Sequence, residues 1–275
     1  MSSENTKSAA SESVYATPKE VTDLSECHFY HTIDLPGHGI QKGPFDLRAG
    51  VDDYLGRIDF RGKRVFELGP ANGYLTFYME QQGAEVVCCD LSPDLEWDIV
   101  PYDATDTAKI IDRRREHIGR QNNAFWFAHR LYKSKAKVIY TSAYEIPPEI
   151  GKFDVAIFGQ VLLHIRDPFR AMECILRHCR DQVVVVETLM SRKQNFVLKL
   201  LNRLQREQTF PVFFLPRGAK QHPIDTWWKF PEWTMEEYLR VLGFEKTSVV
   251  YHEPIHHKAK SNKARLYSMV AKRPS

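Results

Sequence analysis

Short apolar runs alternate with longer helix-like stretches after residue 60 of this 275-residue chain. Several runs are apolar at nearly every position, which is typical of strands buried on both faces of a parallel sheet. The runs are KRVFEL (63–68), AEVVCCD (84–90), AKVIYT (136–141), FDVAIFG (153–159) and DQVVVVE (181–187). This alternation predicts an α/β fold with a doubly wound, mostly parallel sheet and right-handed crossovers.

The stretches between and after these runs predict helices. They cover residues 74–83, 105–132 (in two pieces), 167–180 and 234–244. Asp167 and Pro168 suit the N-cap and first turn of one helix, and Thr234 suits the N-cap of the last. Two strand-like runs at 245–254 and 264–272 have no helix between them. They predict a C-terminal antiparallel hairpin that completes a seven-stranded sheet.

Three segments lie outside this alternating pattern. Residues 1–20 are polar and rich in Ser and Glu, so we expect a flexible tail there. Residues 21–60 and 189–234 combine aromatic, glycine and basic residues without the sheet pattern. We expect the first to form an N-terminal cap and the second an inserted cap on a domain that spans 61–275. Both would lie at the carboxyl edge of the sheet, where open α/β sheets bind ligands.

Composition narrows the class of protein. Apolar residues make up 43% of the chain, enough for a core, and the net charge of +3 does not by itself indicate nucleic acid. Five irregularly spaced cysteines indicate reduced thiols in a cytoplasmic protein. The sequence contains no run long enough to span a membrane, and the N-terminus lacks a signal peptide's apolar region. Cys174 and His178 lie four apart without a second such pair, so we expect no metal.

The stretch FELGPANGYLT (66–76) joins the first run to the first helix through a glycine-rich turn. Such a turn lets a ligand approach the backbone and the helix N-terminus. A dinucleotide would favour G-x-G-x-x-G, whereas this chain has Gly69, Ala71 and Gly73, followed by Tyr74 at the third glycine position. Glu67 would also repel a phosphate. A carboxylate here fits S-adenosylmethionine, which carries an ammonium and a sulfonium and no phosphate.

Asp90 ends the second run, 21 positions after Gly69. A carboxylate at this place can accept hydrogen bonds from both ribose hydroxyls of an adenosine. NAD sites use an acid in the same way, so Asp90 alone does not distinguish the two cofactors.

Several segments in register, VFELGPANGYLT, VVCCDLS, TSAYEIP, FDVAIFGQVLLHIRDP and VVVVETL, resemble the motifs of class I S-adenosylmethionine-dependent methyltransferases, which have a Rossmann-like fold. The resemblance covers about residues 60–188 and, with the hairpin, extends to the end. It implies a set of cofactor-binding positions. They are Gly69, Pro70, Ala71, Asn72 and Gly73 for the methionine part, Asp90 and Leu91 for the ribose, Ser142, Ala143 and Tyr144 beside the adenine, and Gly159, Gln160 and Val161 on the methyl side.

A narrower similarity links KGPFDL (42–47), GQVLLHIRDP and VVVVETL to the tRNA wobble-uridine carboxymethyltransferases, which use a carboxylated cofactor. Lys42 matches the lysine that this family places on the extra carboxylate. Leu163 replaces the family's tyrosine, and the Trp- and Lys-rich segment before the first strand is missing. We therefore expect ordinary S-adenosylmethionine and transfer of a methyl group.

Methyl transfer to a hydroxyl usually needs a base, and histidine has the most suitable free pKa. His164 follows the fourth strand, where cofactor and acceptor should meet, and His31 could reach the site from the N-terminal cap. Either histidine could equally be structural. The basic loop HHKAKSNKAR (256–265) reads as a solvated turn or, alternatively, a phosphate-binding patch.

Acceptor contacts are expected from Lys42 in the first cap and from His222, Trp227 and Trp228 in the second. Paired tryptophans suit an aromatic or sugar-like acceptor, and core packing explains them equally well. We expect O- or N-methylation of a small-molecule acceptor. The alternatives are a tRNA-modifying enzyme, an NAD-dependent oxidoreductase and a non-catalytic cofactor-binding subunit. The oligomeric state cannot be predicted from the sequence.

Overall fold

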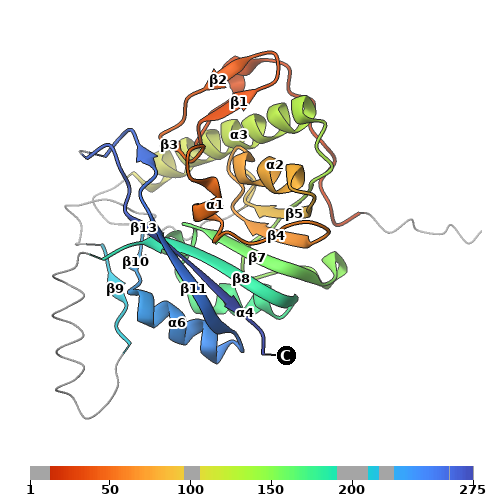
Figure 1. The fold of residues 1–275 in the computed structure, drawn as a ribbon. Coiled ribbons are helices and arrows are strands. Elements are labelled where there is room, and N and C mark those ends of the chain that lie inside the picture. The colour runs from red at the N-terminus through yellow and green to blue at the C-terminus, as the bar shows by residue number, and fades with distance from the viewer. Residues whose placement is uncertain (1–12, 96–105, 191–209, 217–225, 260, 275) are drawn as a thin grey trace, which may run out of the picture.

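The computed structural model describes residues 13–95, 106–190, 210–216, 226–259 and 261–274. Its centre is a seven-stranded sheet in the order β11-β13-β8-β7-β4-β5-β6 (Figure 1). The strands are β4 (Arg64–Leu68), β5 (Glu85–Asp90), β6 (Lys137–Tyr140), β7 (Phe153–Gly159), β8 (Cys179–Thr188), β11 (Glu245–His252) and β13 (Leu266–Lys272). The predicted seven-stranded α/β fold is therefore confirmed.

Pairing directions in the sheet also agree with the expectation. Strands β4 to β8 pair in parallel, while β13 runs antiparallel to β8 and to β11. The carboxyl ends of the parallel strands thus share one edge, which we call the carboxyl edge. Because β11 lies antiparallel to β13, its C-terminal end and the hairpin connection reach the same edge.

Helices cover both faces of the sheet. One face carries α1 (Val51–Tyr54), α2 (Tyr74–Gln81) and α3 (Thr107–Tyr132), and the other carries α4 (Pro168–Leu176) and α6 (Glu232–Val241). Short 3-10 helices are η1 (Leu24–Glu26), η2 (Pro148–Ile150) and η3 (Leu162–His164). Alternate residues of the parallel strands fill two separate buried clusters, which explains their nearly continuous apolar runs.

Two helix predictions need correction. Residues 107–132 form one continuous helix of 26 residues, not two pieces. Gly119 weakens a helix by about 1 kcal/mol relative to alanine, but the following residues, including Phe125 and Ala128, are buried in the core and hold the helix together. Helix α6 begins at Glu232 and not after Thr234. The Thr234 hydroxyl instead donates to Pro211 O (2.8 Å), so tertiary packing uses the group that was expected to cap the helix.

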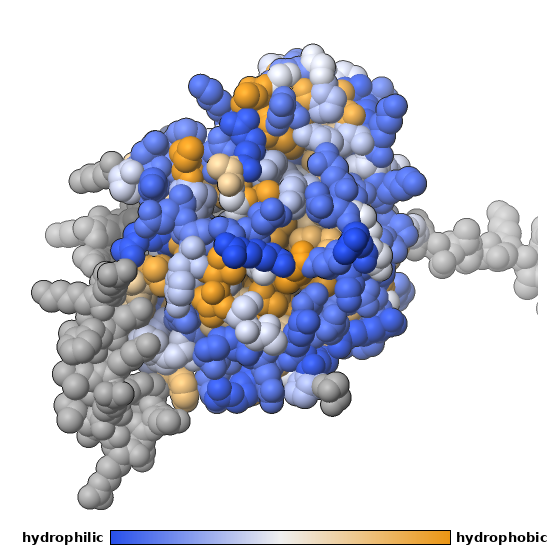
Figure 2. Space-filling view, in the orientation of Figure 1, coloured by the Kyte–Doolittle hydropathy of each residue, from blue (hydrophilic) through white to orange (hydrophobic). Residues whose placement is uncertain are grey.

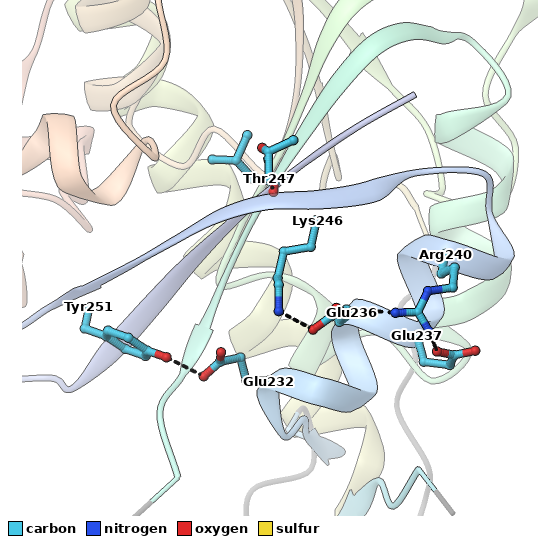
Figure 3. A network of polar contacts seen from close by, with 8 residues as sticks. Glu232, Glu236, Glu237, Arg240, Lys246, Thr247 and Tyr251 are labelled. Atoms are coloured by element: carbon cyan, nitrogen blue, oxygen red, sulfur yellow. Dashed lines mark hydrogen bonds and ion pairs between the residues drawn. The ribbon is translucent and has the colours of Figure 1, made fainter. Parts of the chain in front are cut away.

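The N-cap of α4 is as predicted. Asp167 Oδ1 accepts a hydrogen bond from Arg170 N (3.1 Å), and Pro168 occupies the first turn. Helix α6 is tied to strand β11 on the surface by Lys246–Glu236 and Tyr251–Glu232 contacts (Figure 3). These exposed pairs contribute little individually, since solvent screens them.

The segments outside the main sheet form small ribbons. Strands β1 (Ile33–Leu35) and β2 (Gly39–Gln41) pair with each other, β3 (Phe45–Asp46) pairs with β12 (Ile255–His256), and β9 (Phe213–Phe214) pairs with β10 (Trp228–Lys229). Of the expected tail, residues 1–12 lie outside the described part, and Ala16 N donates to Val138 O of β6 (2.8 Å). Hydrophilic residues dominate the outline of the face in Figure 2, and hydrophobic ones show in its middle.

Candidate active site

The glycine-rich turn lies between β4 and α2 at the carboxyl edge. Gly69, Ala71 and Gly73 have φ of +73°, +54° and +82°, a backbone region that side chains rarely adopt. A Cβ on Gly73 would lie 2.5 Å from the Phe77 ring. Gly73 is also the N-cap of α2. The turn therefore needs glycine for two separate reasons, and it places free backbone N–H groups at a helix start.

Glu67 lies on β4 directly before the turn and is buried. Its Oε2 accepts a hydrogen bond from the Thr76 hydroxyl (2.5 Å), and the Cys88 thiol lies 3.9 Å away. Burial raises the pKa of Glu67 to about 7; the Thr76 bond offsets part of the rise and the charge of Asp90 adds to it. Among the groups that shift the pKa of Glu67 there is no cationic side chain.

Asp90 ends β5, beside the turn. Its Oδ1 accepts a hydrogen bond from Leu91 N (2.8 Å), and Gly69 N donates to Cys89 O (2.8 Å), so the two strand ends are fixed side by side. Burial raises the pKa of Asp90 to about 7, and the Leu91 bond only partly opposes this. The predicted cofactor residues Glu67, Asp90 and Leu91 are therefore brought together.

Asn72 has a role that the sequence did not indicate. Its side chain is buried in the turn, where Oδ1 accepts from Tyr30 N (3.1 Å) and His31 N (2.7 Å) and Nδ2 donates to His31 O (3.2 Å). These bonds attach the N-terminal segment to the glycine turn. The Asn72 side chain is thereby committed to the protein, which leaves the backbone of the turn for a ligand.

His31 is buried, and its Nδ1 has no hydrogen-bond partner among the described residues. Burial lowers its pKa to about 4, so it is neutral at neutral pH. A group with so low a pKa is a weak general base at pH 7. His31 therefore lies beside the turn, as expected, but its environment suits a hydrogen-bonding role better than proton abstraction.

The turn after β6 holds Ser142, Ala143 and Tyr144 next to Asp90, because Thr141 N donates to Asp90 O (3.2 Å). Ser142 Oγ accepts from Tyr144 N (3.2 Å). The Tyr144 hydroxyl accepts from Asp167 N (3.0 Å), and its ring lies under Arg170. The Tyr144 side chain is thus directed to the start of α4, while the backbone of the turn remains beside β5.

Gly159 ends β7, and Gln160 follows with φ of +53°. A Cβ on Gly69 would lie 3.2 Å from Val161 Cγ2, which places Val161 over the glycine turn. A Cβ on Gly159 would lie 3.2 Å from the Tyr54 hydroxyl. Tyr54 is buried at the end of α1, and burial raises its pKa well above the usual value. No pattern in the sequence points to Tyr54, because only the fold brings α1 to β7.

His164 is exposed at the end of η3 in the loop after β7. Trp227 N donates to Leu163 O (2.8 Å) and Trp228 Nε1 donates to Arg166 O (3.1 Å), so the predicted tryptophans flank this loop. Trp227 is buried, and its Nε1 has no partner among the described residues.

The other two predicted acceptor contacts are Lys42 and His222. Lys42 is exposed in the N-terminal segment, next to the buried Gly43. His222 lies outside the described residues.

Glu187 is a second residue that the sequence analysis missed. It lies near the end of β8, is buried, and has no hydrogen-bond partner for Oε1 among the described residues. Burial raises its pKa to about 8, although backbone bonds from Thr188 and Leu163 offset part of the rise. The sequence pattern could have identified Glu187 as a site residue, because it is an acid at the end of an apolar run, as Asp90 is.

The carboxyl edge therefore gathers Glu67, Asp90 and Glu187 on three strand ends, all with pKa values raised by burial. A low-dielectric site with several carboxyls favours a cationic ligand. No three metal-binding side chains lie together among the residues that the structure describes. Within that same part of the chain, no helix has the length and apolar character needed to cross a bilayer.

A family model for a methyltransferase domain matches residues 44–249, well over half of the chain. The N-terminal domain of EvdMO1 with SAH bound has 13% identity and a TM-score of 0.55, over 91% of this chain and 93% of that one. Magnesium protoporphyrin IX methyltransferase from Synechocystis PCC 6803 with bound SAH has 16% identity and a TM-score of 0.48, over 83% and 82%. No curated protein matches the sequence.

The family match covers the glycine turn, Asp90, the β7 loop and the end of β8, which are the parts that form the carboxyl edge. At such low identity, the structural likeness to the EvdMO1 domain shows a shared fold. The chain therefore belongs to the methyltransferase-domain family and is a class I S-adenosylmethionine-dependent methyltransferase.

Proposed function

We propose that the protein transfers a methyl group from S-adenosylmethionine to an oxygen or nitrogen of a small-molecule acceptor. The observation that carries the cofactor assignment is the group of buried and half-buried carboxyls at the strand ends, of which Glu67 and Asp90 flank the glycine turn. Their raised pKa values show that the surrounding protein groups supply little positive charge to these carboxyls. The ammonium and sulfonium of the cofactor would supply it, whereas the phosphates of NAD would not.

Each side of the turn has a distinct part in this proposal. Asp90 would accept hydrogen bonds from the ribose hydroxyls, and the backbone of Gly69 to Gly73 would contact the methionine part. The turn at Ser142 to Tyr144 would lie beside the adenine. Gly159 to Val161 would lie at the methyl side, with Val161 already in contact range of Gly69. Glu67 would act through charge, since its oxygen already binds Thr76.

When bound, the cofactor supplies an electrophilic methyl group on a sulfonium. The acceptor forms the new bond to carbon as the carbon–sulfur bond breaks, and the sulfur keeps the electron pair. The chain's contribution is to align the acceptor and to exclude water. His164, in the loop after β7, would take the proton that a hydroxyl acceptor loses. The lowered pKa of His31 makes it the weaker choice for this step.

The acceptor side would be formed by the loop after β7 and by the tryptophans that flank it. Trp227 and Trp228 are attached to that loop by backbone and indole hydrogen bonds. Lys42 would contact the acceptor from the N-terminal segment, which Asn72 holds on the turn. We propose that residues 21–60 cover the site from one side and residues 189–234 from the other, although residues 191–209 and 217–225 lie outside the described part of the chain.

Thermal-shift titration tests the cofactor assignment. We expect S-adenosylmethionine and S-adenosylhomocysteine to raise Tm in a saturable way, because each binds only the folded protein. NAD at equal concentration should have no effect. Stabilisation by NAD without stabilisation by either sulfur ligand would overturn the proposal.

The acceptor can be sought with methyl-labelled cofactor and a cell extract. We expect a labelled product in the small-molecule fraction that depends on the protein. Label in the RNA fraction would instead favour the tRNA-modifying alternative. A mutant lacking Asp90 provides the negative control, because the proposal requires this carboxylate for cofactor binding.

A further inference from the structure

Three segments that lie far apart in sequence meet at one end of the carboxyl edge (Figure 1). They are the N-terminal segment around His28, the first half of α3, and the connection of the β11–β13 hairpin. His28 N donates to Arg120 O (2.9 Å), and the rings of His28 and His117 lie 4.7 Å apart. On the other side, β12 in the hairpin connection pairs with β3. The basic loop is therefore held against the fold.

This meeting point is joined to the glycine turn by a short series of contacts. The His256 ring stacks on Phe45 with centroids 4.1 Å apart and an angle of 6°. Phe45 lies 6.5 Å from the His31 ring, and His31 N is bound by Asn72 of the turn. Two aromatic rings thus separate the hairpin loop from the residue beside the proposed cofactor site.

Two cationic side chains and three histidines collect at this place. Arg113 and His117 are four residues apart on α3 and so share one face of the helix. His28 touches His117, and Lys258 is exposed on the hairpin loop. Partial burial lowers the pKa of His28, and the charges of Lys258 and Arg120 lower it further. Partial burial and the charge of Lys258 also lower the pKa of His256. Lys258 therefore lies close enough to the N-terminal segment to influence His28.

We define His28, Arg113, His117, His256 and Lys258 as the basic rim. Arg113 donates to Lys109 O in its own helix (3.3 Å), and within the described part of the chain no acid forms an ion pair with Lys258. Asp112 and Glu116 lie beside Arg113 on α3, but residues 107–120 contain five Lys or Arg against these two acids, so the start of the helix keeps a positive charge. An anion near the rim would meet the cationic side chains of Arg113 and Lys258 and the imidazole rings of His28, His117 and His256.

We propose that the basic rim binds a phosphate group of the methyl acceptor, so that the acceptor is a phosphate-bearing small molecule. The proposal rests on the proposed function, because it concerns the acceptor of the same transfer. The rim lies beside the site and not within it, which suits an acceptor whose phosphate is remote from the methylated atom. Binding of this remote group would orient the reacting atom towards the cofactor.

A compact ligand fits the rim better than a polynucleotide does. The whole chain carries a net charge of only +3, whereas nucleic-acid-binding domains usually carry a strongly basic face. The rim spans one face of a helix start and one loop, which is enough for one or two phosphates.

Calorimetric titration with inorganic pyrophosphate, on protein saturated with S-adenosylhomocysteine and at constant ionic strength, tests the site directly. We expect saturable binding that weakens at least tenfold when Arg113→Glu and Lys258→Glu are combined. The matched control combines Arg180→Glu and Lys272→Glu, two exposed cations at the opposite, amino edge of the sheet. Equal weakening by both pairs, or no binding by the wild type, would overturn the proposal.

A second experiment asks whether the phosphate belongs to the acceptor. An extract is treated with phosphatase, the phosphatase is removed, and protein and methyl-labelled cofactor are added. We expect the labelled small-molecule product to disappear after this treatment and to remain after ribonuclease treatment. A product that survives phosphatase, or that only ribonuclease removes, would contradict the inference. Absence of label from untreated extract would instead count against the proposed function, which S-adenosylhomocysteine affinity checks separately.

Discussion

The two halves of the carboxyl edge are built in different ways. At the ends of β4 and β5, the site is fixed by local backbone geometry: positive φ angles at Gly69, Ala71 and Gly73, and an acid at each strand end. At the ends of β7 and β8, it is fixed by bonds between distant segments, such as Trp227 N to Leu163 O. The cofactor half therefore has a continuous sequence signature, whereas the acceptor half does not.

This difference implies that the two halves can be damaged separately. The acceptor half is tested most directly by His164→Ala. We expect turnover of the labelled product to fall by about 1,000-fold, because a general base contributes roughly 10²–10⁴-fold. The affinity for S-adenosylhomocysteine should stay within about twofold. His38→Ala, in an exposed turn away from the site, is the control. Wild-type turnover in H164A would show that His164 is structural.

The cofactor half is tested by changing its backbone geometry. Gly73→Ala should lower the free energy of unfolding by about 3 kcal/mol, since it adds an unfavourable φ and a clash with Phe77. Gly37 has a similar φ of +76° but nothing within 4 Å of a Cβ. Gly37→Ala should therefore cost only about 1 kcal/mol. Urea denaturation measures both, and equal losses would show that packing at Gly73 is unimportant.

The charge in the cofactor half is tested by Asp90→Ala. We expect about 100-fold weaker binding of S-adenosylhomocysteine, because two hydrogen bonds to a charged acceptor are lost, at about 1.5 kcal/mol each. Asp94→Ala, in the exposed loop that follows, should leave the affinity unchanged. Calorimetric titration compares the two variants, and similar affinities would remove Asp90 from the site.

The smallest effect is expected at Glu187, on the acceptor half. In the native state its pKa is about 8, above the value near 4.5 in the unfolded chain. The native protein therefore holds a proton that the unfolded chain releases between pH 4.5 and 8, and stability falls as pH rises through this window. Glutamine does not titrate, so Glu187→Gln removes this loss of stability with rising pH. Relative to wild type, the variant should gain about 2 kcal/mol between pH 5 and pH 6.5.

Denaturation at several pH values measures this gain. Glu245→Gln, on the exposed start of β11, should give a difference that does not change with pH. A Glu187→Gln difference that is equally flat would mean that the native pKa is not raised.

The difference between local and distant contacts also explains which features of the fold and the site could be predicted from the sequence. The strands, the hairpin and the Asp167 cap could be predicted, because each depends on residues that are close together in the sequence. Glu67 and Asp90 could be read because spacing along the chain places them at strand ends. Tyr54 could not, since its hydroxyl reaches Gly159 only after α1 packs on the sheet. Thr234 was misread because tertiary contact with Pro211 replaced a local cap.

The bond between Asn72 and the N-terminal segment has a consequence for hydrogen exchange. The amides of Tyr30 and His31 belong to a segment with little regular structure, yet both donate to one buried side chain. They should exchange with solvent far more slowly than neighbouring loop amides, at the rate at which the turn opens. A ligand that stiffens the turn would slow them further. Two amides in an irregular segment would then report occupancy of a site formed some forty residues later in the chain.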